Sequence, residues 1–147
     1  MKTRQLICIC FILLGLTSAL VGCKLISFPH RFDQDLQNVE EVQLLQYHYH
    51  TRNTTPIAIL DNDVSRDLLT EITQLPCYRY FNDPSTDYGN TIIQITYSNG
   101  EGEIIGNRNS ASISKDGKWN KKSYYFDSAQ WDSVISKYLK TEDGSLS

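Results

Sequence analysis

The chain has 147 residues, with 17 acidic against 14 basic side chains and a formal net charge of −3. An acidic chain of this size is a poor candidate for a nucleic-acid-binding protein, which would need a basic surface. It is also short enough that we expect a single domain.

The first 22 residues have the layout of a secretory signal peptide. Lys2 and Arg4 form a basic start, and Leu6–Leu20 is an apolar run of the length that such peptides use. An uncleaved transmembrane helix is the competing interpretation. The segment from Leu6 to Gly22 would span only about 25 Å as a helix, which is short of the roughly 30 Å hydrocarbon core. Length alone therefore disfavours a membrane-spanning helix without excluding it.

The stretch Leu20-Val21-Gly22-Cys23 favours the signal peptide. It resembles the end of bacterial lipoprotein signals, which is a Leu, an aliphatic or small residue, Gly or Ala, and then Cys. The resemblance covers about the first 23 residues. It implies cleavage between Gly22 and Cys23, a diacylglyceryl group on the Cys23 sulfur and further acylation, for example by palmitate. It also implies a lipid-anchored location on the extracytoplasmic face of the cell membrane.

Four segments are expected: a signal peptide (1–22), a lipidated tether (23–38), one domain (39–140) and a flexible tail (141–147). After cleavage, 12 basic residues would remain against 17 acidic ones. Besides Cys23, Cys77 would be the one cysteine left, so no internal disulfide is predicted. The domain must therefore be stabilised by its core.

Within the domain, hydrophobic periodicity predicts alternating short strands and two amphipathic helices. Val64, Leu68 and Ile72 form one apolar helical stripe, and Asp127 with Gln130 forms a capping-box pattern at the start of the second helix. Ser98-Asn99-Gly100 and Asp116-Gly117 are predicted hairpin turns. In chain order, the expected elements are strands over 41–50 and 57–60, a helix over 64–75, strands over 78–81, 91–97, 101–106, 110–114 and 118–126, and a helix from 127 to about 140.

These elements predict an α+β fold: a two-layer domain with a curved antiparallel sheet of about five or six strands and two helices on one face. The element order resembles a single TATA-binding-protein-like unit, in order only. The run from Val64 through Asn107 to the closing helix is also similar to small uncharacterised lipoproteins of low-GC Gram-positive bacteria. That resemblance implies no activity.

Several residue pairs could carry chemistry, and each has a structural alternative. His48 and His50 share one face of a strand and could bind a metal if a third ligand were near, but a solvated strand face is the commoner meaning. His30 is placed in the tether. Cys77 is interpreted as a nucleophile or, more often for such a residue, as a buried thiol. Glu101 and Glu103 are on one face of a hairpin strand, a pattern typical of a solvated face.

Three further features have a binding and a structural interpretation. Asp61-Asn62-Asp63 is similar to the start of a calcium loop but lacks its glycine and closing glutamate, so a helix cap is predicted. The polar loop Asn82–Asn90 is a candidate contact surface. Aromatic residues of the strands could line a sugar or peptide groove or pack the sheet; they are Tyr78, Tyr80, Trp119, Tyr124 and Tyr125.

No catalytic, cofactor or nucleic-acid motif is present in the sequence. We therefore expect a lipoprotein without a cofactor or enzymatic activity, anchored through Cys23 and presenting a small domain that binds an envelope protein or ligand. Two alternatives remain open. One is an inhibitor or immunity-type protein directed against an envelope or secreted enzyme, and the other is a small envelope hydrolase. The sequence leaves the oligomeric state open.

Overall fold

The computed structural model describes residues 27–79 and 87–143. The signal peptide, Cys23, most of the loop at 82–90 and the last four residues lie outside these ranges. Across the described residues, no helix is long and apolar enough to cross a membrane.

A six-stranded antiparallel sheet forms one layer, with the order β3-β2-β5-β6-β7-β8. Its strands are β2 (Val39–His48), β3 (Asn53–Leu60), β5 (Thr91–Tyr97), β6 (Gly102–Gly106), β7 (Ser110–Ile113) and β8 (Trp119–Lys122). Both predicted hairpin turns are confirmed: Gly100 and Gly117 adopt the positive φ values of +81° and +73° that tight turns require.

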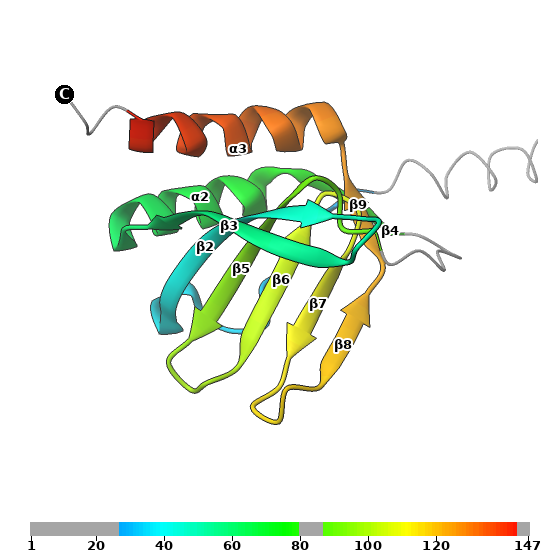
Figure 1. Cartoon of the computed structure of the whole chain (residues 1–147). Helices are drawn as coiled ribbons and strands as arrows, with labels where there is room; N and C mark the ends of the chain where they lie inside the picture. Colours follow the sequence, from blue (N-terminus) through cyan, green and yellow to red (C-terminus); the bar gives the residue numbers. More distant parts are fainter. Residues whose placement is uncertain (1–26, 80–86, 144–147) are drawn as a thin grey trace, which may run out of the picture.

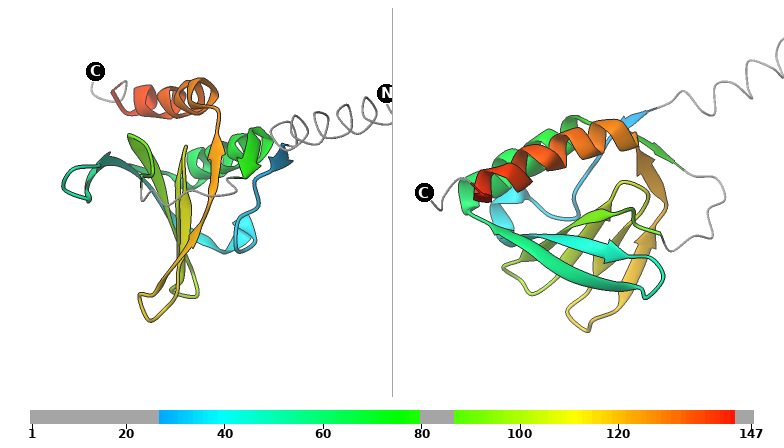
Figure 2. Two further views of the ribbon diagram at one scale, coloured as in Figure 1. Left: turned by 90° about the vertical axis from the view of Figure 1, so that its right-hand side faces the viewer. Right: turned by 45° about the horizontal axis from the view of Figure 1, so that its top comes forward.

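Two antiparallel helices, α2 (Asn62–Gln74) and α3 (Ser128–Asp143), form the second layer. Figures 1 and 2 show them side by side. Asp61 is the N-cap residue of α2, as the helix-cap interpretation predicted, although its side chain makes no capping hydrogen bond. Asp127 accepts a hydrogen bond from the Gln130 backbone N–H at 3.0 Å, which confirms the predicted cap of α3. The predicted two-layer α+β fold is therefore confirmed.

A second, three-stranded sheet was not predicted. Its order is β1-β4-β9, from Phe28–Pro29, Pro76–Arg79 and Tyr124–Phe126. It arises because the single strand expected over 118–126 is interrupted at Ser123, so that β8 stays in the large sheet while β9 pairs with β4. Its first strand lies in the predicted tether, and a short 3₁₀ turn follows at Leu36–Asn38. The folded domain thus begins at Phe28, ahead of the boundary at residue 39 that the sequence predicted.

β3 also starts earlier than predicted, at Asn53, and includes Pro56. Proline has no backbone N–H to donate. A central strand would lose a hydrogen bond between strands, whereas an edge strand can place proline where its N–H would face away from the sheet. Because β3 is at the edge of the sheet, only its β2-facing side needs donors.

One hydrophobic core joins the helices to one face of the six-stranded sheet. Trp131 of α3 is its largest fully buried side chain and stacks on Phe126 with a centroid distance of 5.1 Å. From the sheet, β2 contributes Val42 and Leu44, and β5 contributes Ile93, Ile95 and Tyr97. A smaller cluster on the opposite sheet face contains Leu45, Tyr47, Ile92 and Ile104.

Candidate functional site

Part of the helix-facing side of the large sheet is polar, and residues near the start of the domain cover it. We call residues 28–38 the strap. Figure 2 (left) shows it, in blue to cyan, running down beside the sheet. Where the strap meets the sheet, their polar side chains form a group that we call the strap cluster. It comprises His30 and Asp33 of the strap with Tyr97, Glu103, Ser112 and Lys122 of the sheet.

Glu103 is at the centre of the strap cluster and is fully buried, with 0% of its surface exposed. Its Oε2 accepts hydrogen bonds from the Tyr97 hydroxyl at 2.9 Å and from the Asp33 backbone N–H at 3.1 Å. The Lys122 ammonium donates to Oε1 at 3.4 Å. The interpretation of Glu103 as part of a solvated face is therefore wrong. Period-two alternation places Glu103 on the same inward face as Ile105.

Asp33 connects the strap to the far strands of the sheet. Its carboxylate accepts hydrogen bonds from the Lys122 ammonium on β8 and from the Ser112 hydroxyl on β7. Desolvation opposes ionisation of Asp33, but these two hydrogen bonds outweigh it and lower the pKa of the carboxyl group. Asp33 is therefore ionised at neutral pH, and one lysine serves two carboxylates.

His30 is buried, not part of a solvated tether, with 4% of its surface exposed. Its ring is surrounded by Phe32, Tyr124 and Phe126 at centroid distances of 4.9, 5.0 and 5.6 Å. Burial, followed by the positive charge of Lys122, lowers the pKa of His30 to about 4. Its Nε2 lies 3.9 Å from Glu103 Oε1, beyond hydrogen-bond distance.

The His30–Glu103 pair could in principle exchange a proton. Burial raises the pKa of Glu103 while that of His30 is lowered, and opposite shifts in two neighbouring groups are typical of acid–base chemistry. Both side chains, however, are buried between the strap and the sheet. A substrate could reach them only if the strap moved. In the observed structure the contacts of this cluster hold the strap against the sheet, and we call them the clasp.

The predicted metal pair is not joined by a third ligand from the described part of the chain. His48, at the end of β2, contacts the Thr55 hydroxyl through Nε2 at 3.1 Å, while His50 is in the following turn and packs edge-on against Tyr49. No group of three or more His, Cys, Asp or Glu side chains among the described residues could hold a metal ion.

Cys77 is a free thiol on β4 and is fully buried, with 0% of its surface exposed. Desolvation raises its pKa to about 12, and the nearby Arg79 charge only partly offsets this. A thiol in this state is a poor nucleophile.

The aromatic candidates do not form one groove. Tyr78 and Tyr125 stack on each other across the small sheet at 5.2 Å, and Tyr124 is buried in the core. Trp119 is 57% exposed at the start of β8. Tyr80 lies outside the described residues.

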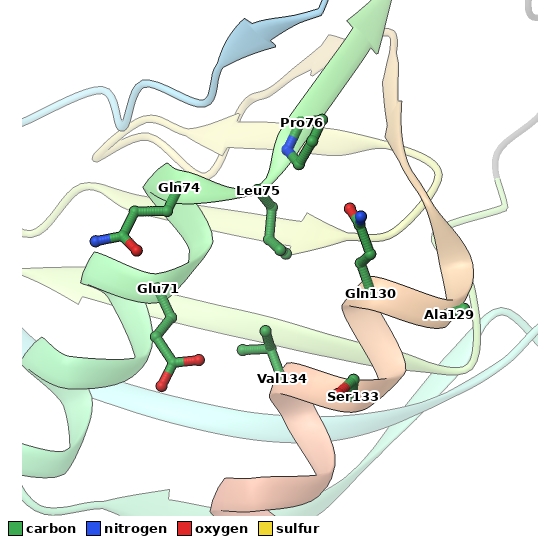
Figure 3. A pocket seen from close by; sticks show the side chains of 8 residues that line it. All are labelled: Glu71, Gln74, Leu75, Pro76, Ala129, Gln130, Ser133 and Val134. Carbon is green, nitrogen blue, oxygen red and sulfur yellow. The ribbon is translucent and has the colours of Figure 1, made fainter.

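A groove of about 530 Å³ runs between the second half of α2 and the first half of α3 (Figure 3). Glu71, Gln74 and Leu75 line one side, and Gln130, Ser133 and Val134 line the other. Glu71 also joins the two helices, since its carboxylate accepts from Lys137 at 2.6 Å and from Tyr138 at 2.8 Å. The groove is shallow and open along its length, and it contains no cluster of titratable side chains.

Comparison with known proteins found no matching family model, no similar curated protein and no similar solved structure.

Proposed function

We propose that this protein is a lipoprotein, held on the extracytoplasmic face of the cell membrane by a diacylglyceryl group on Cys23, and that it presents a small binding domain. The observation that carries the proposal is the position of Leu20-Val21-Gly22-Cys23. It follows a short apolar run with a basic start, and Cys23 is only five residues before Phe28, where the folded domain begins.

The physics of lipid anchoring supports this proposal. One acyl chain binds a membrane only marginally, whereas two or more hold a protein there. The domain itself has an excess of acidic residues, so its net charge offers no substitute for the lipid.

The interior of the domain supports a binding role over a catalytic one. The titratable groups with the clearest opposite pKa shifts, His30 and Glu103, are buried between the strap and the sheet. The hydrogen bonds of Glu103 hold Asp33, Tyr97 and Lys122, and catalysis would require a cleft open to substrate.

The anchor is tested by substituting Cys23→Ser in the full-length precursor expressed in a bacterial host. We expect the variant to leave the membrane fraction or to remain an unprocessed precursor, and to incorporate no radiolabelled palmitate. Cys77→Ala is the matched control, because it removes the other cysteine of the mature chain and should remain lipidated and membrane-bound. Membrane association, size and labelling of Cys23→Ser identical to wild type would refute the proposal.

A second candidate function is inhibition of an envelope or secreted enzyme, and the edge strand β3 favours it. Ile57 and Ile59 are 41% and 58% exposed on this edge, which could add a strand from a partner. Crosslinking in the native envelope, with wild type and Ile59→Lys compared, tests it. A partner lost specifically from Ile59→Lys supports this role, and an unchanged set of crosslinked proteins contradicts it.

A further inference from the structure

The lysines of this acidic protein are concentrated in one hairpin. Four of the seven lysines that follow Gly22 lie within residues 115–122, and Asp116 is the one acidic residue among them. The excess of acidic residues in the chain as a whole conceals this local positive charge.

The β7–β8 hairpin presents these charges around an exposed tryptophan. Trp119 is 57% exposed, and Lys115, Lys118 and Lys121 are exposed around it. Lys122, by contrast, pairs with Ser110 on the inward face and contacts the strap cluster. In Figures 1 and 2 the turn of this hairpin projects from the end of the sheet remote from α3.

We propose that the β7–β8 hairpin docks on the anionic surface of the same bilayer in which Cys23 is anchored. This inference rests on the proposed lipid anchor. Tryptophan favours the membrane–water interface, where its ring is apolar and its N–H is hydrated. Lysines beside it are attracted to anionic headgroups.

The strap connects the anchored start of the domain to the hairpin strand β8. Cys23 and Phe28 are five residues apart, so the link between them spans at most about 18 Å. Further along the strap, Asp33 forms an ion pair with Lys122 of β8. Trp119 is three residues from Lys122 along the same strand, about 10 Å. The strap and its ion pair with Lys122 therefore connect the anchored start of the domain to the hairpin.

Tethering makes a weak contact sufficient. A short link holds the hairpin at an effective concentration in the millimolar range next to the lipid surface. At physiological salt, charges more than about 8 Å from that surface are largely screened, so acidic groups elsewhere on the domain oppose docking only weakly. The lipid anchor then fixes the distance to the membrane, and the hairpin fixes the orientation of the domain.

The two tryptophans allow a direct test on the full-length lipidated protein in vesicles. Trp131 is 1% exposed and supplies a constant background, whereas Trp119 reports on the hairpin. Vesicles contain phosphatidylcholine brominated near the headgroups, with or without phosphatidylglycerol. We expect strong quenching of Trp119 in the anionic vesicles, weak quenching in the zwitterionic ones, and loss of quenching in 1 M salt. Trp119→Phe should show background quenching only.

Lys115→Gln/Lys118→Gln should lower the ratio of docked to undocked protein about 30-fold. The matched control is Arg52→Asn/Arg66→Gln, which removes two exposed positive charges elsewhere. Asn suits position 52 because Arg52 has a φ of 55°. The control should be quenched like wild type.

Co-flotation with the vesicles, measured on the same samples, separates the two proposals. Protein that floats but is quenched no more than Trp119→Phe, or is quenched equally in zwitterionic vesicles, overturns docking and leaves the anchor intact. Protein that does not float overturns both. A change in Trp119 emission with soluble polyphosphate but not with anionic vesicles would make the ligand a polyanion and also overturn membrane docking.

Discussion

Removing the Glu103 side chain is the sharpest test of the strap cluster. Glu103→Ala deletes the acceptor of the Tyr97 hydroxyl and of the Asp33 backbone N–H. Lys122 loses one carboxylate but retains the other, on Asp33. The substitution therefore leaves two donors without their acceptor, while Lys122 stays paired with Asp33.

The expected cost follows from these lost partners. Each of the two buried donors left unpaired costs roughly 1–3 kcal/mol, whereas Lys122 adds little because it keeps its ion pair with Asp33. Relief from burying a carboxylate, whose pKa is raised, offsets part of this. From the two unpaired donors, we expect Glu103→Ala to lower the free energy of unfolding by about 3–5 kcal/mol. Glu103→Gln keeps an acceptor oxygen for Tyr97 and Asp33 and should cost about 1 kcal/mol.

Urea unfolding of the unlipidated mature chain, followed by tryptophan fluorescence, measures both variants. With a slope of about 1.5 kcal/mol per M, the midpoint of Glu103→Ala should fall by about 2–3 M. Glu101→Ala is the matched control: this partly exposed carboxylate of the same hairpin bonds Gln34 and Asn99, and its loss should cost under about 1 kcal/mol. The assignment of Glu103 as the centre of the clasp fails if Glu103→Ala costs no more than Glu101→Ala, or if Gln costs as much as Ala.

Three further predictions concern buried groups. The pKa of His30 is about 4 in the folded protein and 6.5 in the unfolded chain. Between these two pH values, His30 takes up a proton only in the unfolded chain. The free energy of unfolding should therefore fall by about 3 kcal/mol as the pH drops from 6.5 to 4. Glu103 has a raised pKa, so its protonation stabilises the folded protein as the pH falls and partly cancels this effect. The dependence of the free energy of unfolding on pH is therefore compared between wild type and His30→Phe, in which it should be weaker. Cys77, with a pKa of about 12, should react with a thiol reagent only as fast as the protein unfolds in urea; rapid labelling of the native protein would contradict its burial. Gly106→Ala should lower the free energy of unfolding by more than about 2 kcal/mol, because the new Cβ would lie 1.8 Å from the Tyr88 carbonyl oxygen. Thermal unfolding measures this. No change in stability would mean that the backbone around Tyr88 moves aside without cost.

The parts of the fold that were predicted correctly depend on local periodicity. The stripe of Trp131, Val134, Ile135 and Tyr138 repeats at helical spacing, and all four side chains are buried in the core. Ile93, Ile95 and Tyr97 alternate with Gln94 and Thr96, and the structure has the predicted strand β5 over the same residues, Thr91–Tyr97. Such patterns can be recognised within one segment, without knowing which helix or strand packs against it.

The strap cluster could not be found in this way, because its contacts join distant residues. Asp33 and Glu103 are 70 positions apart, and no local pattern records which segment covers which strand. Two weak signals were present nonetheless. Glu103 shares the inward alternation of Ile105, and Phe28, His30 and Phe32 alternate with period two in the segment interpreted as a tether. The interruption at Ser123 is another long-range effect, since β9 leaves the large sheet to pair with β4.

The strap is the element that links the proposed lipid anchor to the proposed docking of the hairpin. β1 is only two residues long, so its pairing with β4 resists little pull from the anchor. The next strong attachment is Asp33, held through its backbone N–H by Glu103 and through its carboxylate by Lys122. If the whole strap detached from the sheet, the free link would extend from Cys23 to Val39, where β2 begins. Its maximum length would then increase from about 18 Å to about 55 Å. The effective concentration of the β7–β8 hairpin at the membrane would then fall, since it decreases as the link outgrows the span. A buried carboxylate that contacts no ligand would thus control how the domain faces the bilayer, and Glu103→Ala should weaken the quenching of Trp119 as well as the fold.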